Sequence, residues 1–547
     1  MVRCFAKWVL AAESIIHFEG VKRVSLKRII SVIISVLLLI AAAGCGKTAQ
    51  QTSVGNSNSE QVLRLGSVFD FKSATEGKNL IMEFLVKVDH EGNPVPALAE
   101  SWDISDDGKI YTFHLRKGVR FHNGTPFNAS AAKFAFEWMA NSLAFGAYVD
   151  KTETPDDNTL KVYLKQNYSM LLLNLAGGSS TVICAEAVEP AGSTNGKLTN
   201  FIGTGPFKLV SYEKDKEAVL ARNDQYWGTK PKVDKVVWKT IPDSHAQIVA
   251  LKAGEIDMVG ITEHHSSVPY VEVPGLKKAG INIEVKSYGR YQVLEYNCQR
   301  ELFMDKNVRM AFNYAIDKGK MVKELFGGLA EPAYTITAPW FKYGPSEVKI
   351  KYSYDLDKAK QLLTEAGWQD SNSDGILDKN GKPLTFELLI PAGEANADAV
   401  AIFVQSELKK IGVDMKLLTM ENGAAWDRSR KGDYDMFVHH SFCLPSIPGA
   451  IGIGDKYHSK AKSWPSAYHS AELDQLLENA FTVTTEDAKR KELCNQAWDI
   501  LHEQAPCIPL YDIVKVVAFR DNISGFKPGP TMFDMLLNDI EVKQQAK

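Results

Sequence analysis

Hydrophobic residues follow two different spacings along this chain. Tyr111, Phe113 and Leu115 alternate with polar residues, which is the period of a half-buried β-strand. Amphipathic patterns instead predict helices in three later segments, 307–326, 355–367 and 397–411. Because strand-like and helix-like segments are interleaved, the pattern predicts a mixed α/β fold.

The segment 94–138 combines both patterns within a short stretch. Its compact apolar start, 97–102, predicts a short helix. The turn residues at 106–109 predict a hairpin, because glycine reaches positive φ and aspartate can accept hydrogen bonds from its own main chain. Asn128 or Ser130 could then cap a second helix.

The first sixty residues have the pattern of an export signal followed by a tether. Basic residues precede an uncharged apolar run at 29–43, which is shorter than a membrane-spanning helix and typical of a signal peptide. Small residues lead up to Cys45, so we expect 1–44 to be a signal peptide and Cys45 to be lipidated. An ordinary signal peptide cut just before this cysteine is the alternative. We interpret 1–20 as a misassigned extension, and the polar stretch 45–60 as a flexible tether.

The length and charge of the chain limit the possible architectures and partners. About 500 residues follow the leader, more than one ordinary hydrophobic core holds, so at least two lobes are expected. Lys and Arg number 63 against 66 Asp and Glu, and no basic block indicates a nucleic-acid partner. No segment beyond the leader is apolar enough to span a membrane, so a transport role would need partner membrane subunits. The seven cysteines are scattered without CxxC spacing, which gives no sign of a zinc or redox site.

Several sequence blocks together resemble one known family. The first is LAESWDIS, followed by DDG, YTFHLRKGVRFHNG and PFNA, and the later blocks are GTGPF and VRMAFNYAID. They resemble the family 5 extracytoplasmic solute-binding proteins, which are the receptors of peptide and nickel ABC importers. The first block is long and specific, although it is scaffold rather than ligand site.

The resemblance implies an architecture. It implies the large two-lobed α/β periplasmic-binding fold, with an extra subdomain and mixed sheets joined by hinge strands. Lobe 1 would comprise residues 61–281 and 516–547, and lobe 2 residues 282–515.

The resemblance also implies where a solute binds. The first loop and a later strand and loop, MFVHHSFCLP, match segments that line the cleft in the family. We therefore predict ligand contacts from Phe69, Phe71, Arg290, Tyr291, Trp426, His439, His440 and Phe442. Peptide-binding members carry an acidic residue just after the aromatic at Phe442, where this chain has Cys443. The sequence of this region is closer to the nickel-chelate branch of the family, in which nickel is cargo and not a resident cofactor.

One loop has the opening of a calcium site. Asp370, Asn372, Asp374 and Asp378 occupy positions 1, 3, 5 and 9 of an EF-hand-like pattern, with glycine at position 6. Position 12, which should be glutamate, is Gly381. A solvent loop rich in turn-forming residues is the favoured alternative to a calcium site. No other cofactor is expected.

The expected function is capture and not chemistry. The chain has no GxSxG, HExxH or paired-carboxylate motif, so we do not expect an enzyme. We predict a monomeric, lipid-anchored solute-binding protein that delivers a peptide or nickel chelate to an ABC permease energised by a separate ATPase. Two other interpretations remain: a hydrolase, and a signalling or chaperone-like lipoprotein that binds peptides or proteins without transport.

Overall fold

The computed structural model describes residues 60–177, 180–262, 268–392, 396–440, 456–460, 468–482 and 486–543. The predicted signal peptide, the lipidation site Cys45 and the tether up to residue 59 lie outside the described residues, as does Phe442. No helix in the described part of the chain is long and apolar enough to cross a membrane.

Ten strands form one mixed sheet in the order β10-β11-β12-β1-β13-β20-β14-β19-β17-β18. Their bounds are β1 Val62–Ser67, β10 Phe207–Glu213, β11 Glu217–Arg222, β12 Lys235–Thr240, β13 Met258–Val259, β14 Asn282–Tyr296, β17 Thr385–Pro391, β18 Asp414–Met420, β19 Met436–His440 and β20 Cys507–Phe519. β1 runs parallel to both β12 and β13, and helix α6 (Ser244–Ala253) connects those two strands. The GTGPF block leads into the antiparallel pair β10–β11.

The two longest strands, β14 and β20, form the middle of this sheet. They pair antiparallel from Asn282 opposite Phe519 to Glu295 opposite Cys507. β20 pairs on its other side with β13, and β14 pairs on its other side with β19. The predicted hinge strands therefore join strands of the first predicted lobe to strands of the second. The lobe boundaries themselves stay a prediction.

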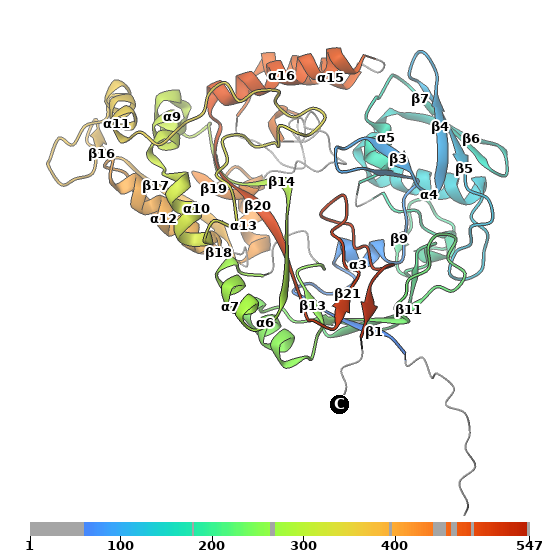
Figure 1. Cartoon of the computed structure of the whole chain (residues 1–547). Helices are drawn as coiled ribbons and strands as arrows, with labels where there is room; N and C mark the ends of the chain where they lie inside the picture. The colour runs from blue at the N-terminus through green and yellow to red at the C-terminus, as the bar shows by residue number, and fades with distance from the viewer. Residues whose placement is uncertain are drawn as a thin grey trace, which may run out of the picture. The chain divides into compact units, whose positions relative to one another are not determined.

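A separate sheet carries the sequence block that most resembles the family. It has the order β4-β5-β7-β6, with bounds Ala99–Ile104, Ile110–Leu115, Thr159–Leu164 and Val149–Asp156. Tyr111, Phe113 and Leu115 are buried, as their alternation predicts. Helix α4 (Ala129–Ser142) contacts β6 and β7 (Figure 1), and the Asn128 Oδ1 atom accepts a hydrogen bond from the Ala131 amide at 3.1 Å. The N-cap alternative at Asn128 is thus confirmed.

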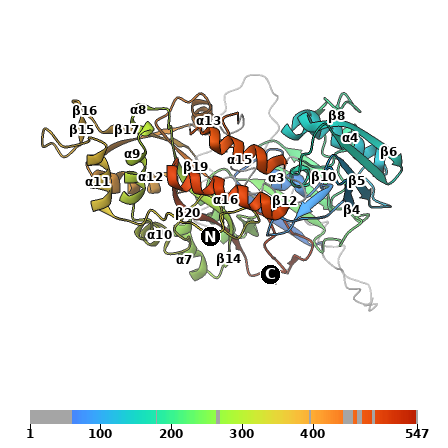
Figure 2. The same ribbon diagram turned by 90° about the horizontal axis from the view of Figure 1, so that it is seen from above.

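Helices accompany the second half of the ten-stranded sheet. They are α9 Lys306–Ala315, α10 Lys318–Phe326, α11 Leu356–Glu365, α12 Ala397–Lys409, α13 Asn422–Arg430, α15 Ala471–Thr482 and α16 Asp487–Gln504. α15 and α16 lie side by side (Figure 2), and α11 packs on α9.

The structure corrects two expectations about helices. Segment 97–102 is not a helix, because 99–104 forms β4 and pairs antiparallel with β5. The predicted helix over 307–326 is two helices, since α9 ends at Ala315 and Asp317 caps α10 by accepting the Lys320 amide at 2.8 Å. Cross-strand pairing overrides the apolar pattern in the first case, and a capping aspartate interrupts the helix in the second.

Strand β20 contributes to three hydrophobic clusters. Val517 belongs to the cluster that contains β1 and α4, and Ile508 belongs to the cluster around α9 and α12. Cys507 belongs to a third cluster beneath α15 and α16. Because one strand is shared, the three clusters are linked through the middle of the sheet.

Candidate functional site

The predicted ligand residues of the second lobe come from three adjacent strands. Tyr291 on β14 lies opposite Asp512 on β20, and Val293 lies opposite His439 on β19. Tyr291 and Val293 are two residues apart, so their side chains leave the same face of the sheet. The register therefore places Tyr291, His439 and Asp512 on one face.

Trp426 and the two histidines form an aromatic cluster. Trp426 comes from α13, and its ring centroid lies 5.1 Å from that of His439, 6.3 Å from that of His440 and 4.8 Å from that of Phe437. Both histidines are buried, at 5% and 4% exposure. Of the predicted site residues, the structure thus brings together Trp426, His439 and His440.

Two basic side chains affect the electrostatics of His439. Burial holds the pKa of His439 well below its usual value, and the nearby charges of Lys456 and Arg290 lower it further. The imidazole is therefore neutral at pH 7. Arg290, which we predict as a ligand contact, is itself buried, at 2% exposure.

A buried ion pair holds Lys456 beside this cluster. Its Nζ atom lies 2.5 Å from a carboxylate oxygen of Glu295 on β14, and both side chains are less than a tenth exposed. Burial raises the pKa of Glu295, while the positive charge of Lys456 lowers it. Separating such a pair by removing one partner leaves an uncompensated charge in the interior.

Asp512 is a further polar residue on this face of the sheet, and the sequence analysis did not single it out. The Ser287 hydroxyl donates a hydrogen bond to Asp512 Oδ2 and accepts one from the Gly289 amide at 3.1 Å. Asp512 Oδ1 is buried and has no hydrogen-bond partner among the described residues. Burial raises the pKa of Asp512 to about 6, with a further contribution from Glu331. The only sequence signal was a single acidic residue within the apolar strand IPLYDIVKVV.

The two predicted contacts in the first lobe lie in the loop after β1. Phe69 is 36% exposed, and its carbonyl accepts a hydrogen bond from Trp238 Nε1 at 3.1 Å. Phe71 is only 1% exposed and packs edge-on against the Trp238 ring at 5.4 Å. Phe71 thus has a packing role in the lobe 1 core, and its contact with ligand stays a prediction.

The calcium-like loop is organised by hydrogen bonds to its own main chain. The Asp370 carboxylate accepts the amides of Asp374 and Gly375 at 3.2 and 3.0 Å. Asp378 accepts the amide of Ser371, and Asn372 Oδ1 also accepts the amide of Asp374. No group of three or more His, Cys, Asp or Glu suited to a metal occurs among the described residues. Calcium binding stays a prediction, which calorimetry with calcium would test.

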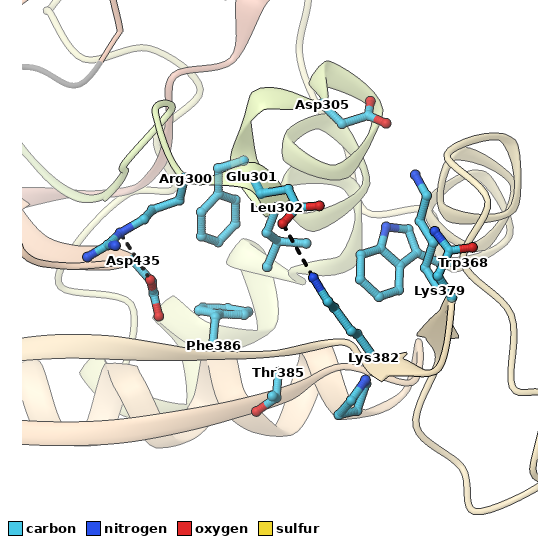
Figure 3. A pocket seen from close by; sticks show the side chains of 13 residues that line it. Arg300, Glu301, Leu302, Asp305, Trp368, Lys379, Lys382, Thr385, Phe386 and Asp435 are labelled. Carbon is cyan, nitrogen blue, oxygen red and sulfur yellow. Dashed lines mark ion pairs between the residues drawn. The ribbon is translucent and has the colours of Figure 1, made fainter.

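A cavity of about 340 Å³ lies elsewhere in the second predicted lobe (Figure 3). Phe386, Leu302 and Trp368 supply its apolar side chains. Ion pairs lie at its edge, with Arg300 Nε 3.5 Å from Asp435 and Lys382 Nζ 3.7 Å from Glu301. None of the predicted ligand residues lines this cavity.

Known proteins resemble this chain over most of its length. The model of the bacterial extracellular solute-binding proteins, family 5 Middle, matches residues 93–444. The chain is 28% identical to the oligopeptide-binding protein AppA of Bacillus subtilis, over 84% of this chain and 85% of AppA. It is 27% identical to the nickel-binding periplasmic protein of Escherichia coli K12, over 85% of this chain and 90% of that protein. The structure of NikA from Brucella suis in complex with Fe(III)-EDTA has a TM-score of 0.81 and 28% identity, covering 88% of this chain and 100% of NikA.

The fold and these comparisons define an extracytoplasmic solute-binding protein with the two-lobed α/β architecture. The chain belongs to the family 5 bacterial extracellular solute-binding proteins. The family resemblance and the fold class predicted from the sequence are thereby confirmed. The relatives are binding proteins of transporters, so this chain is a binding protein and not an enzyme. The closer resemblance to the nickel-chelate branch stays a prediction.

Proposed function

We propose that this protein captures a peptide-class or nickel-chelate solute between its two lobes and delivers it to the permease of an ABC importer. Support comes from the family membership and from relatives that are named for oligopeptide and for nickel binding. Hinge strands such as β14 and β20 allow a solute to favour a closed arrangement of two lobes that already exists in equilibrium.

The observation that carries the proposal is a buried arginine, Arg290, near the Trp426–His439 cluster. Burial lowers the pKa of His439 and the charges of Lys456 and Arg290 lower it further, but Lys456 is paired with Glu295, so Arg290 is the cation that we expect to attract a solute. A guanidinium group favours a solute with carboxylates, which both peptides and organic metal carriers have. A neutral imidazole is also the form that ligates metals, so a chelate could use His439 directly.

Native mass spectrometry of the purified protein is the first test, because a captured solute should co-purify with it. The expected result is one additional mass of peptide or metal-chelate class, released unchanged on unfolding. Recovery of a chemically altered solute, or of a bound protein chain, would contradict the proposal.

Two tryptophan variants then locate the site. Trp426→Ala removes the ring beside His439 and His440, and we expect it to weaken binding of the co-purified solute at least tenfold. Trp368→Ala is the matched control, since Trp368 lies in the second predicted lobe but lines the separate cavity of Figure 3. Equal affinities of the two variants, measured by calorimetry, would remove the site assignment.

Membrane anchoring of the protein and delivery of the solute to a permease must be tested in cells. We propose that Cys45 carries lipid and that the protein acts as a monomer with its permease and ATPase. Cys45→Ala should release the protein from the membrane fraction and reduce solute uptake. Uptake that is unchanged in a strain lacking this protein would contradict delivery while leaving solute binding intact.

A further inference from the structure

Arg290 lies at the end of a bulge in strand β14. The regular register with β20 is interrupted between Ser287 and Tyr291, so residues 288–290 face only Ile513 of β20. A bulge bends its strand and interrupts the ladder of hydrogen bonds that would otherwise fix the backbone. Contacts from outside this strand pair must therefore help to fix the direction in which the Arg290 side chain leaves the sheet.

One C-terminal loop contacts both hinge strands beside this bulge. The Gly529 carbonyl accepts hydrogen bonds from Lys286 Nζ at 2.9 Å and from the Tyr288 hydroxyl at 3.2 Å. Lys515, which lies opposite Lys286 on β20, donates to the Met532 carbonyl at 2.7 Å. Like charges directly opposite each other in a strand pair are unfavourable, and here carbonyls of the loop accept from both lysines.

Contacts that do not involve β14 anchor this loop. We call residues 525–540 the hinge loop, which connects two short paired strands, β21 Ile523–Ser524 and β22 Glu541–Val542. Glu541 forms an ion pair with Lys232 at 2.5 Å. Leu537 and Ile540 are buried in the hydrophobic cluster that contains β1 and α4. The hinge loop is therefore a support that is fixed to the first predicted lobe.

The part of the hinge loop that reaches the bulge has a constrained backbone. The Asp534 carboxylate accepts hydrogen bonds from the amide and the hydroxyl of Thr531, at 2.9 and 2.6 Å. Pro528 and Pro530 flank Gly529, and each restricts the backbone to one range of φ. A Cβ atom added at Gly529 would lie 2.4 Å from the Cβ atom of Asp534, so the chain is closely packed there. The Gly529 carbonyl is therefore an acceptor with a defined position.

We propose that the hinge loop positions Arg290 for a solute carboxylate, an inference that rests on the proposed function. By holding Lys286 and Tyr288, the Gly529 carbonyl fixes the start of the bulge and thereby the direction of the guanidinium group. Lys286 and Tyr288 are then positioning residues that act through Arg290. A guanidinium group that is already ordered binds more tightly, because less conformational entropy is lost when the solute arrives.

Hydrogen exchange without solute tests the first step of this argument. Tyr288→Phe removes only the hydroxyl that reaches Gly529, and we expect amides of residues 286–291 to exchange about fivefold faster or more. Tyr270→Phe is the matched control, because Tyr270 is also buried and its hydroxyl donates to the Val514 carbonyl of β20 at 2.9 Å. The control should leave exchange in that segment unchanged. Unchanged exchange in Tyr288→Phe would overturn the inference.

Affinity is measured calorimetrically with probes that carry carboxylates. The probes are the best-retained member of a randomised tripeptide library and the nickel(II)–histidine complex. With a probe that the wild type binds, Tyr288→Phe and Lys286→Met should each weaken binding about fivefold or more. Lys286→Arg keeps a donor for Gly529 and should stay within about twofold of wild type. Lys239→Met is the control, since Lys239 on β12 also donates to a carbonyl, that of Glu255 at 3.3 Å, and its loss should leave affinity unchanged.

A double-mutant cycle separates positioning from a general structural effect. In an Arg290→Met background, Tyr288→Phe should change affinity by less than about twofold, because its effect acts through Arg290. Equal losses in the wild-type and Arg290→Met backgrounds would overturn the inference, as would wild-type affinity in Tyr288→Phe, and both results would leave solute capture standing. A wild-type protein that binds neither probe would contradict the proposed function, and this inference with it.

Discussion

Charged side chains within the central strands are the most informative single residues in this molecule. Glu295 and Lys456 neutralise each other in a pair, whereas Asp512 has a hydroxyl and backbone neighbours but no cation among the described residues. A carboxylate kept in that condition destabilises the fold, and such a cost is typical of binding sites. Removing the charge of Asp512 should therefore raise stability at neutral pH.

The pH dependence of stability should report Asp512. Its pKa rises from 3.8 to about 6 on folding, so the folded protein binds the proton more tightly. The resulting stabilisation is complete below about pH 4 and is lost as the pH rises through 6. Asp512→Asn avoids that loss, so without solute it should be more stable than wild type at pH 7, by up to about 3 kcal/mol. Melting temperatures of both proteins from pH 4 to 8 test this, and a constant difference across that range would contradict it.

Gly289 should be essential to the irregular turn of β14. Its φ is +68°, and an added Cβ atom would lie 2.6 Å from the Cβ atom of Ala338. Gly289→Ala should therefore destabilise the protein by about 2–4 kcal/mol, from backbone strain and steric overlap together. Gly327→Ala is the control, since Gly327 has φ +59° but open space around it and should cost only about 1 kcal/mol. Chemical denaturation measures both, and equal losses would show that the overlap at Ala338 is relieved without cost.

At the scale of elements, aspartates define where several helices begin. Asp317 accepts the Lys320 amide at 2.8 Å, and Asp355 and Asp243 cap α11 and α6 in the same way. Asp317→Ala should lower stability by about 1 kcal/mol, whereas Asp317→Asn should change it little because asparagine also caps. A thermal denaturation series would check this, and a loss shared by both variants would assign the effect to charge instead of capping.

The sequence predicted elements well where the pattern was local, and poorly where distant segments decided it. The alternation at Tyr111, Phe113 and Leu115 is local, and it identified β5 correctly. Segment 97–102 is a strand because β5 pairs with it, which its own residues do not reveal. Arg309 lies on an amphipathic helix, yet it is 3% exposed and donates hydrogen bonds to the carbonyls of Phe303 and Gln504. A residue nearly 200 positions away therefore determines its role.

In the candidate site, too, some residues could be predicted from the sequence and others depend on distant segments. Similarity to the family led to Trp426, His439 and His440, and the structure brings them together. Asp512 could not be selected in this way, because its importance depends on what faces it across β14 and on the donor that Oδ1 lacks. Pairing register and hydrogen-bond satisfaction are properties of the folded chain.

At the scale of the whole molecule, the ten-stranded sheet determines which parts of the chain solute binding stabilises. β20 contributes to all three large hydrophobic clusters, so a change at its centre reaches each of them. Solute bound beside His439 would contact β19, which pairs with β14, the neighbour of β20. Binding should therefore stabilise the described chain as one cooperative unit, although multidomain proteins often unfold in separate steps.

Calorimetric unfolding with and without solute tests this coupling. After the co-purified solute has been removed, the protein should unfold in a single transition. Solute at about 100 times its dissociation constant should stabilise the folded state by about 2.7 kcal/mol and move that whole transition upward. Trp426→Ala should need more solute for the same shift, and Trp368→Ala should behave as wild type. Two transitions, of which solute moves only one, would show that the lobes unfold independently and that β20 does not couple them.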